Sequence, residues 1–402
     1  MPKVLVVDDS ALMRRLITGV LNEAGHETLT AMNGSEGVEK LVAWKPDVVT
    51  LDINMPNMDG LTALSLMMAA RPTPVIMVSS LTEQGALATF EALALGAVDF
   101  ITKPGGTISL SIDDIQQQLL DKIAAALGAH PRHQASGSTV RTRRQGNSKD
   151  ASTTPSPSPA RQATSRHIAA RSVGARHAGD PAPSGKTEAS AQQADPVDQA
   201  TGLVLIGVST GGPRTLEDIL PALPADFPCP VVVAQHMPAN FTDAFARRMD
   251  RMCQLQVREV SHAMPLEAGQ VYIGMGGTDM IVMERLGRLV VAPKPESPDH
   301  PWHPSVDVLV NSAMRHLEPS RITGVQLTGM GDDGASAMTE LKQRGGRTIA
   351  EAESTAVVFG MPNELIQRGG ATVVLPCHQV ARQLIGWLHR KERTRHGTAK
   401  SH

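Results

Sequence analysis

The sequence predicts an α/β protein built from two doubly wound parallel-sheet domains joined by a long disordered linker. Short apolar runs alternate with helix-like segments in both halves of the chain, and this alternation is typical of parallel sheets. The composition also changes sharply near the middle, and 402 residues exceed one ordinary domain. We expect a first domain over 1–127, a linker over 128–200, a second domain over 201–390 and a basic tail over 391–402.

The overall composition excludes several classes of protein. Hydrophobic residues make up 41% and charged residues 19%, which is enough for globular cores. A net charge of −2 gives no general attraction to nucleic acid or to membranes. The three cysteines form no close-spaced pair, which indicates a reducing compartment and argues against a disulfide framework or a zinc ribbon. Because no apolar run reaches the ~18 residues of a membrane span, we expect a cytoplasmic protein without membrane insertion.

Four strand-like segments define the first domain. Each is apolar and ends in a polar residue, and an amphipathic helix-like segment over 11–24 follows the first. The expected strands are 3–9, 47–52, 74–80 and 97–103. In such a sheet, ligands bind outside the carboxyl ends of the strands.

Five chemically useful side chains follow these strands. They are Asp8, Asp9, Asp52, Ser79 and Lys103. Clustered carboxylates repel one another and favour a hard dication such as Mg²⁺. Asp52 can accept a phosphoryl group, with Lys103 pairing to a phosphoryl oxygen and Ser79 donating a hydrogen bond. A single acid at a strand end is usually just solvated, but five matching types at strand ends argue against that interpretation.

The middle of the chain is poor in large apolar residues. From about Ala129 to Ala200, Pro, Ser, Thr, Arg, Ala, Gln and Gly dominate. Such a segment cannot bury enough surface to offset its chain entropy, so we expect a flexible linker. Its arginines could contact nucleic acid, but a solvated basic linker is the better interpretation, and we expect no nucleic-acid partner.

A strand, a sharp turn and a helix are predicted around Ser209. The apolar run Leu203–Val208 ends at this serine, and a Gly-Gly-Pro sequence and a helix-like segment follow. Gly207, Ser209 and Gly211 have the Gly-x-Ser-x-Gly spacing of a nucleophile elbow. A helix N-terminus there would favour an oxyanion and equally a phosphate. Alone the pattern is weak, because Gly-rich turns between strands and helices are common.

Two further polar positions strengthen the case for a catalytic site. His236 follows the strand-like run 230–234, and Asp332 and Asp333 lie in a Gly-rich loop after the run 323–327. Other strand-like runs cover 271–273 and 289–291. A serine, a histidine and an aspartate at the carboxyl ends of one sheet would form a nucleophile, a base and an orienting carboxylate.

The first domain resembles the receiver domain of two-component response regulators, a flavodoxin-like fold. The resemblance is carried by Val-Asp8-Asp9-Ser, Leu-Asp52-Ile-Asn54-Met-Pro, Val-Ser79-Ser and Asp-Phe100-Ile-Thr-Lys103-Pro. It implies that Asp52 is the phosphoacceptor and that Ser79, Phe100 and Lys103 form the switch. It also implies an Mg²⁺ site made by Asp8, Asp9, Asp52 and the carbonyl of Asn54.

The second domain is similar to the catalytic domain of chemotaxis protein-glutamate methylesterases, the CheB family, whose hydrolase domain is Rossmann-like. The matching stretches are Ile206-Gly-Val-Ser209-Thr-Gly-Gly-Pro, Gln235-His236-Met-Pro, Pro304-Ser-Val-Asp307, Leu327-Thr-Gly-Met330-Gly-Asp332-Asp333-Gly and Val358-Phe-Gly-Met-Pro362. The resemblance implies Ser209 as nucleophile, His236 as base, Asp333 as the triad carboxylate and the Met330 N–H as an oxyanion donor. His303 stands where the family commonly has a basic residue.

Together the two resemblances imply a phosphorylation-activated serine hydrolase that demethylates glutamate esters, and deamidates glutamines, on chemotaxis receptors. A histidine kinase would be the phosphodonor, Mg²⁺ would serve the receiver domain only, and we expect a monomer. The main alternative is a receiver-controlled binding module without enzymatic activity. A receiver-linked transcription factor is disfavoured, because the chain has no helix-turn-helix pattern and no basic output domain.

Overall fold

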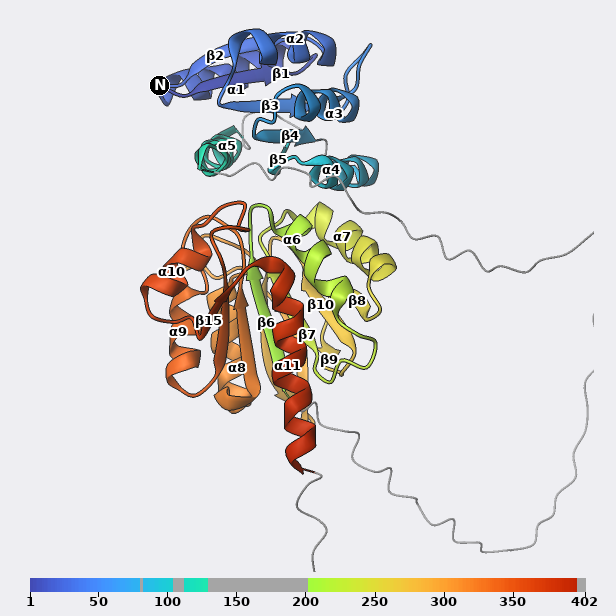
Figure 1. The fold of residues 1–402 in the computed structure, drawn as a ribbon, viewed down its shortest axis with the longest axis vertical. Helices are drawn as coiled ribbons and strands as arrows, with labels where there is room; N and C mark the ends of the chain where they lie inside the picture. The colour runs from blue at the N-terminus through green and yellow to red at the C-terminus, as the bar shows by residue number, and fades with distance from the viewer. Residues whose placement is uncertain (80–81, 104–111, 129–201, 396–402) are drawn as a thin grey trace, which may run out of the picture. The chain divides into compact units, whose positions relative to one another are not determined.

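The computed structural model describes residues 1–79, 82–103, 112–128 and 202–395, and the expected linker lies outside them apart from its first residue. Two parallel sheets are formed, as the alternation of strands and helices predicts (Figure 1). The second sheet is accompanied by a small antiparallel sheet that the sequence indicated only in part, through the run 289–291.

The first sheet has the strand order β2-β1-β3-β4-β5, and all its pairs are parallel. Its strands are β1 (Lys3–Val7), β2 (Glu27–Ala31), β3 (Val48–Asp52), β4 (Val75–Ser79) and β5 (Asp99–Thr102). Its helices are α1 (Ala11–Glu23), α2 (Gly34–Trp44), α3 (Gly60–Ala70), α4 (Glu83–Leu95) and α5 (Ile112–Leu127). Strand β2 was not predicted, because its Glu-Thr-Leu-Thr-Ala sequence has little apolar character and it lies at the sheet edge.

Both faces of the first sheet are covered by helices. Val4 and Val6 of β1 pack in one apolar cluster with Ile17 of α1 and Leu119 of α5. The alternate residues of β1 pack in the other cluster, with side chains from α2 and α3. Strand side chains alternate between faces, so a strand covered on both sides is apolar throughout, as the sequence of β1 shows.

The second sheet has the order β15-β14-β13-β6-β7-β10-β8 and is also parallel. Its strands are β6 (Leu203–Val208), β7 (Val231–Gln235), β8 (Gln256–Val260), β10 (Gln270–Gly274), β13 (Ile322–Gln326), β14 (Arg347–Glu351) and β15 (Val373–Leu375). The antiparallel sheet consists of β9 (Met264–Pro265), β11 (Asp279–Arg285) and β12 (Arg288–Lys294).

Two layers of helices enclose this second sheet. Side chains of α6, α7 and α11 pack on one face, and side chains of α8, α9 and α10 pack on the other. These helices are α6 (Gly212–Ile219), α7 (Ala239–Met252), α8 (Val306–His316), α9 (Ala335–Gln343), α10 (Met361–Gln367) and α11 (Cys377–Arg395). Two short 3₁₀ helices, η1 (Leu220–Ala222) and η2 (Pro319–Arg321), lie between these elements. Helix α11 continues past the expected domain end at residue 390.

Candidate functional sites on the two sheets

Ser209 directly follows β6, at a tight turn into α6. Gly211, the residue before α6, has a φ of 77°, a conformation that glycine adopts without strain. The Ser209 N–H donates to the carbonyl of Thr328 at 2.9 Å, and its carbonyl accepts from Gly212 at 2.8 Å. The side-chain amide of Gln235 also donates to the Ser209 carbonyl, at 3.0 Å. These bonds fix the backbone that carries the hydroxyl.

The register of the sheet places His236 beside Ser209. Val208 of β6 stands opposite Gln235 of β7, so the next residue of each strand is the candidate serine and the candidate histidine. The His236 N–H donates to the carbonyl of Val208 at 3.0 Å. Two residues that lie far apart in sequence are therefore neighbours at one edge of the sheet.

Asp333 completes the group. One of its carboxylate oxygens lies 2.9 Å from Nε2 of His236 and accepts from the N–H of Val306 at 2.7 Å. The other accepts from the Ser305 hydroxyl at 2.9 Å and from the N–H of Asp307 at 3.1 Å. Burial acts to raise the pKa of Asp333, but the bonds from His236 and the backbone outweigh it and hold this pKa below its ordinary value. The carboxylate is thus fixed as an anion that orients the imidazole.

The neighbouring Asp332 has a different environment. Its side chain is 56% exposed and pairs with the guanidinium of Arg368 at 2.8 Å on the surface. Asp333 is only 4% exposed. The geometry favours Asp333 as the partner of His236.

The histidine ring is held between Asp333 and an aromatic face. With Nε2 directed at Asp333, the buried Nδ1 has no hydrogen-bond partner within the described residues. Trp302 lies parallel to the ring, with centroids 5.8 Å apart and planes 6° apart. Nδ1 is therefore the nitrogen available to take a proton from a nucleophile.

The loop carrying Met330 lies against the serine. A Cβ built on Gly329 would lie 2.7 Å from the Cβ of Ser209, so only glycine allows this approach. On the other side, a Cβ on Gly331 would meet the Trp302 ring at 2.8 Å. Met330 lies between Gly329 and Gly331 in the chain, so its backbone is next to Ser209.

Two residues of this site were not singled out from the sequence. Ser305 donates to Asp333 and also accepts from the N–H of Val308 as the N-cap of α8. Trp302 lies one residue before His303, whose Nδ1 contacts the fully buried Asp279 at 2.9 Å. A serine before a helix start is a recognisable capping signal. The hydrogen bond from Ser305 to Asp333 could not be recognised in this way, because Asp333 lies in the loop after β13, far away in sequence.

The acidic residues of the first sheet also converge. Ligand oxygens of Asp8, Asp9 and Asp52 all lie within 4.8 Å of one another. Lys103 Nζ lies 2.7 Å from Asp52 and 3.1 Å from Asp8. Burial raises the pKa of Asp52, and Lys103 counteracts that shift only in part. Three carboxylate oxygens at this spacing fit a hard divalent cation such as Mg²⁺.

The remaining receiver residues surround this cluster or lie close to it. The Asn54 N–H donates to Asp52 Oδ1 at 3.3 Å. The Ser79 hydroxyl donates to the carbonyl of Gly85 at 3.2 Å and accepts from Thr89 at 2.8 Å, so it faces α4. Phe100 is buried, and its ring centroid lies 4.4 Å from that of Phe241 in α7.

Residues of the first sheet contact the neighbourhood of Ser209, and the described residues of both sheets belong to one compact unit. The hydroxyl of Thr210, next to the serine, donates to Asp99 at 2.7 Å. Arg214 of α6 donates to the carbonyl of Ala94 at 3.2 Å. These contacts join the residue before Phe100 to the residue after the candidate nucleophile.

The two sites define a class of protein: a serine hydrolase fused to a phosphoacceptor domain. Comparison with protein families matches residues 4–112 to the response regulator receiver domain and residues 204–384 to CheB methylesterase. The chain is 52% identical over 402 residues, 100% of both chains, to protein-glutamate methylesterase/protein-glutamine glutaminase 3 of Rhodospirillum rubrum. The chain belongs to the CheB methylesterase family.

A second relative agrees with this assignment. A protein-glutamate methylesterase/protein-glutamine glutaminase 2 of Rhodopseudomonas palustris is 49% identical over 96% of this chain and 98% of its own length. The catalytic domain of Thermotoga maritima CheB is similar at 38% identity with a TM-score of 0.45, covering 46% of this chain and 98% of that one. No helix within the described residues is long and apolar enough to cross a membrane.

Proposed function

We propose that this protein is a phosphorylation-activated methylesterase that hydrolyses glutamate methyl esters, and deamidates glutamines, on methyl-accepting chemotaxis receptors. The observation that carries the proposal is the hydrogen-bonded His236–Asp333 pair beside Ser209 on adjacent strands. Close relatives carry both activities in their names.

In the proposed reaction, the Ser209 hydroxyl attacks the γ-carbonyl of the modified glutamate. His236 takes the hydroxyl proton at Nδ1, while Asp333 holds Nε2–H and stabilises the imidazolium. The backbone N–H of Met330 donates to the oxyanion. The imidazolium then protonates the leaving methoxide or amide, releasing methanol or ammonia. Water, deprotonated by His236, hydrolyses the acyl enzyme and regenerates the serine.

Phosphorylation is proposed to occur on Asp52, with a histidine kinase as donor. Asp8, Asp9, Asp52 and the carbonyl of Asn54 would hold Mg²⁺, which neutralises charge on the transferring phosphoryl group. Lys103 would pair with a phosphoryl oxygen, and Ser79 would leave its partners on α4 to donate to another. No cofactor is proposed for the hydrolase site.

The protein is further proposed to act in the cytoplasm. Its three cysteines are free thiols, which fits a reducing compartment. The monomeric state stays a prediction.

Methanol release from methylated receptor membranes tests the proposed function. The wild type should release methanol, faster with acetyl phosphate and Mg²⁺ than without. Ser209→Ala should lose activity by about 10⁴-fold or more, since the acyl enzyme cannot form. A folded wild type that binds receptor but releases neither methanol nor ammonia would favour the non-enzymatic binding module instead.

A further inference from the structure

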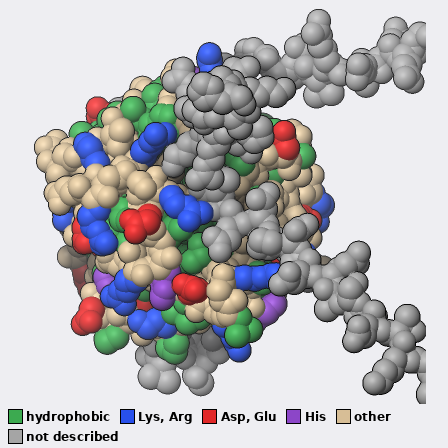
Figure 2. Space-filling view, turned by 90° about the horizontal axis from the view of Figure 1, so that it is seen from below, with side chains coloured by type: hydrophobic (Ala, Val, Ile, Leu, Met, Phe, Trp, Pro, Cys, Tyr) green, Lys and Arg blue, Asp and Glu red, His purple; other side chains and the backbone are tan. Residues whose placement is uncertain are grey.

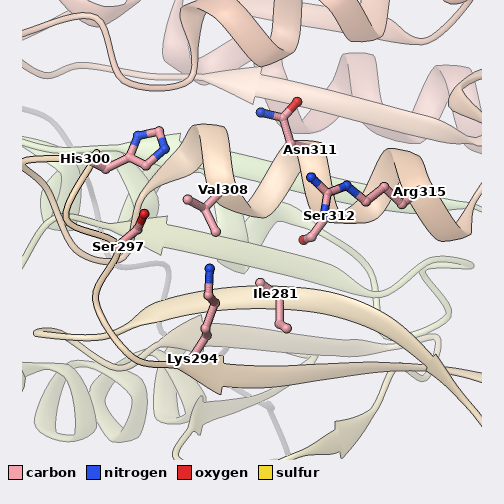
Figure 3. Close-up of a pocket in the computed structure, with 8 residues that line it drawn as sticks. All are labelled: Ile281, Lys294, Ser297, His300, Val308, Asn311, Ser312 and Arg315. Carbon is pink, nitrogen blue, oxygen red and sulfur yellow. The ribbon is translucent and has the colours of Figure 1, made fainter.

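A cavity of about 200 Å³ lies between α8 and the β11–β12 hairpin of the second domain. Figure 3 shows the side chains that line it, with His300 near the first turn of α8, Arg315 near its last turn and Lys294 reaching toward the helix from β12. None of these residues takes part in the proposed chemistry.

The lining of this cavity is basic and polar. Three of its side chains carry or can carry positive charge: Lys294, His300 and Arg315. Ser297 and Asn311 add neutral hydrogen-bonding groups, and none of the described residues that line the cavity is acidic. Within the described ranges, Lys294 and Arg315 form no ion pair. Lys294 and Arg315, two lining cations without an acid partner among the described residues, raise the local positive potential and favour an anion.

The face of the protein drawn in Figure 2 is not uniformly basic. On the face drawn in Figure 2, Lys and Arg side chains lie interspersed with acidic and hydrophobic ones. The chain as a whole has a net charge of −2. A polyanion such as nucleic acid therefore fits poorly, and a ligand with a few anionic groups fits better.

One residue that lines the cavity, His300, lies close to the catalytic carboxylate. A ring nitrogen of His300 lies within 4.8 Å of carboxylate oxygens of both Asp307 and Asp333. The segment after His300 continues to Trp302, which lies parallel to His236. Since α8 rises ~1.5 Å per residue, the part of α8 that lines the cavity, from Val308 to Arg315, is about 10 Å long. It can hold more than one carboxylate of an extended or helical segment.

We propose that this cavity, lined by Lys294, His300 and Arg315, is an accessory substrate site. It binds the carboxylates of an acidic polypeptide segment that flanks the glutamate ester in the active site. The inference rests on the proposed function, since a glutamate-containing protein substrate supplies carboxylates and the reaction produces another. Lys and Arg bind such groups through charge-assisted hydrogen bonds.

Lys294→Glu and Arg315→Glu test this role in the full-length chain. Each should raise KM for methylated receptor about fivefold or more and leave kcat nearly unchanged, because substrate attraction is lost and the triad is intact. Hydrolysis of p-nitrophenyl acetate, which has no flanking carboxylates, should not change. Arg288→Glu is the matched control, an exposed cation at the opposite end of β12, and should leave both substrates unaffected.

Salt and inorganic phosphate separate the possible outcomes. Raising ionic strength should increase the wild-type KM for receptor more than that of Lys294→Glu, since screening acts on the same charges. Phosphate at constant ionic strength could inhibit receptor hydrolysis by the wild type while Lys294→Glu and Arg315→Glu leave the KM for receptor unchanged. In that case the cavity is a site for free anions and the proposal is wrong. The proposal would also be overturned if the two variants lost the same share of their activity on receptor and on p-nitrophenyl acetate.

Receptor binding by the Ser209→Ala protein gives a readout that does not require turnover. Adding Lys294→Glu should weaken its sedimentation with receptor membranes, whereas Arg288→Glu should not. Unaltered sedimentation would contradict the accessory site even if the esterase activity is established. If the wild type has no esterase activity but Lys294→Glu still weakens sedimentation with receptor membranes, the proposed function is refuted and the accessory site is not.

Discussion

Asp332 and Asp333 are adjacent in sequence but differ in burial and in partners. Asp333 accepts four hydrogen bonds, from His236, Ser305 and two backbone N–H groups at the start of α8. Asp332 makes a surface ion pair with Arg368, and such pairs contribute only about 0–1 kcal/mol. Asp333→Asn should therefore reduce kcat by about 10⁴-fold, while Asp332→Asn should reduce it less than about threefold.

Methanol release by the two variants measures this difference. Circular dichroism serves as the control for folding, since both changes keep the side-chain volume. If Asp332→Asn instead of Asp333→Asn shows the large loss of kcat, Asp332 is the catalytic carboxylate and the assignment is wrong.

The lowered pKa of Asp333 also predicts a pH dependence of stability. A carboxyl whose folded-state pKa lies below its ordinary value of 3.8 stabilises the fold above that pH, and the stabilisation is lost as pH falls through the lowered pKa. Asp333→Asn should thus reduce the urea midpoint by a similar amount from pH 7 to about pH 4.5. The difference between the urea midpoints of the wild type and the variant should become smaller only below pH 3.8. A gap that closes already near pH 6 would mean that another group is titrating.

The position of the candidate site residues at one sheet edge could be predicted from the sequence, but their fine geometry could not. Ser209, His236 and Asp333 each follow an apolar strand, and polar residues after parallel strands gather at one sheet edge. The parallel ring of Trp302 and the second bond of Ser305 depend on the long segment between β12 and α8. That segment has no repeating pattern, so its path is decided by tertiary contacts such as those of the buried Asp279.

At the scale of elements, most strands buried on both faces were predictable, but the buried inner strand β14 was not, and of the edge strands of the parallel sheets only β5 was expected. The strand β6 was expected at the same residues, 203–208, because every side chain in it is apolar or glycine and buried. The strands β2 and β15 lie at sheet edges and are partly exposed, and β15 has only 3 residues, so their sequences lack a strong signal. The antiparallel hairpin of β11 and β12 was recognised only in part, through its apolar run 289–291.

The carboxyl ends of β1, β3 and β5 bring Asp8, Asp52 and Lys103 together, and this predicts the site of phosphorylation. Asp52→Asn should abolish Mg²⁺-dependent labelling by acetyl phosphate, because the acceptor oxygen is lost. Mg²⁺ should also raise the Tm of the wild type by a few degrees, since ligands that bind only the folded state stabilise it. That shift should shrink in the variant, where one ligand oxygen is replaced by an amide.

Asp59→Asn is a matched control for this experiment. Asp59 caps α3 and lies outside the acidic cluster, so its replacement should leave labelling intact. Labelling that persists in Asp52→Asn would refute the assignment of the acceptor.

At the scale of the whole molecule, we propose that contacts between residues of the two domains carry the effect of phosphorylation to the catalytic site. Phe100 packs against Phe241, and its neighbour Asp99 accepts a hydrogen bond from Thr210, beside Ser209. Ser79 faces α4, which contributes Phe90 to the same aromatic group. A phosphoryl group that draws Ser79 toward Asp52 would change α4 and these contacts. The receiver would then restrain the hydrolase until it is phosphorylated.

Arg214→Ala tests whether these contacts restrain the enzyme. The guanidinium donates to carbonyls at the end of α4, so its loss should weaken the unphosphorylated contact. A shift of about 1 kcal/mol changes a two-state equilibrium roughly fivefold. The rate of methanol release without phosphodonor should therefore rise by up to about fivefold, while the rate with acetyl phosphate should stay the same.

Arg344→Ala is the matched control, because among the described residues this arginine of the second domain makes only a local ion pair, with Glu340 on the surface. A fragment beginning near residue 200 should show the same raised rate as the phosphorylated chain. If Arg214→Ala and the fragment both match the unphosphorylated wild type, the contacts do not restrain catalysis. Phosphorylation would then have to act by recruiting the enzyme to its substrate, since the hydrolase site would already be open.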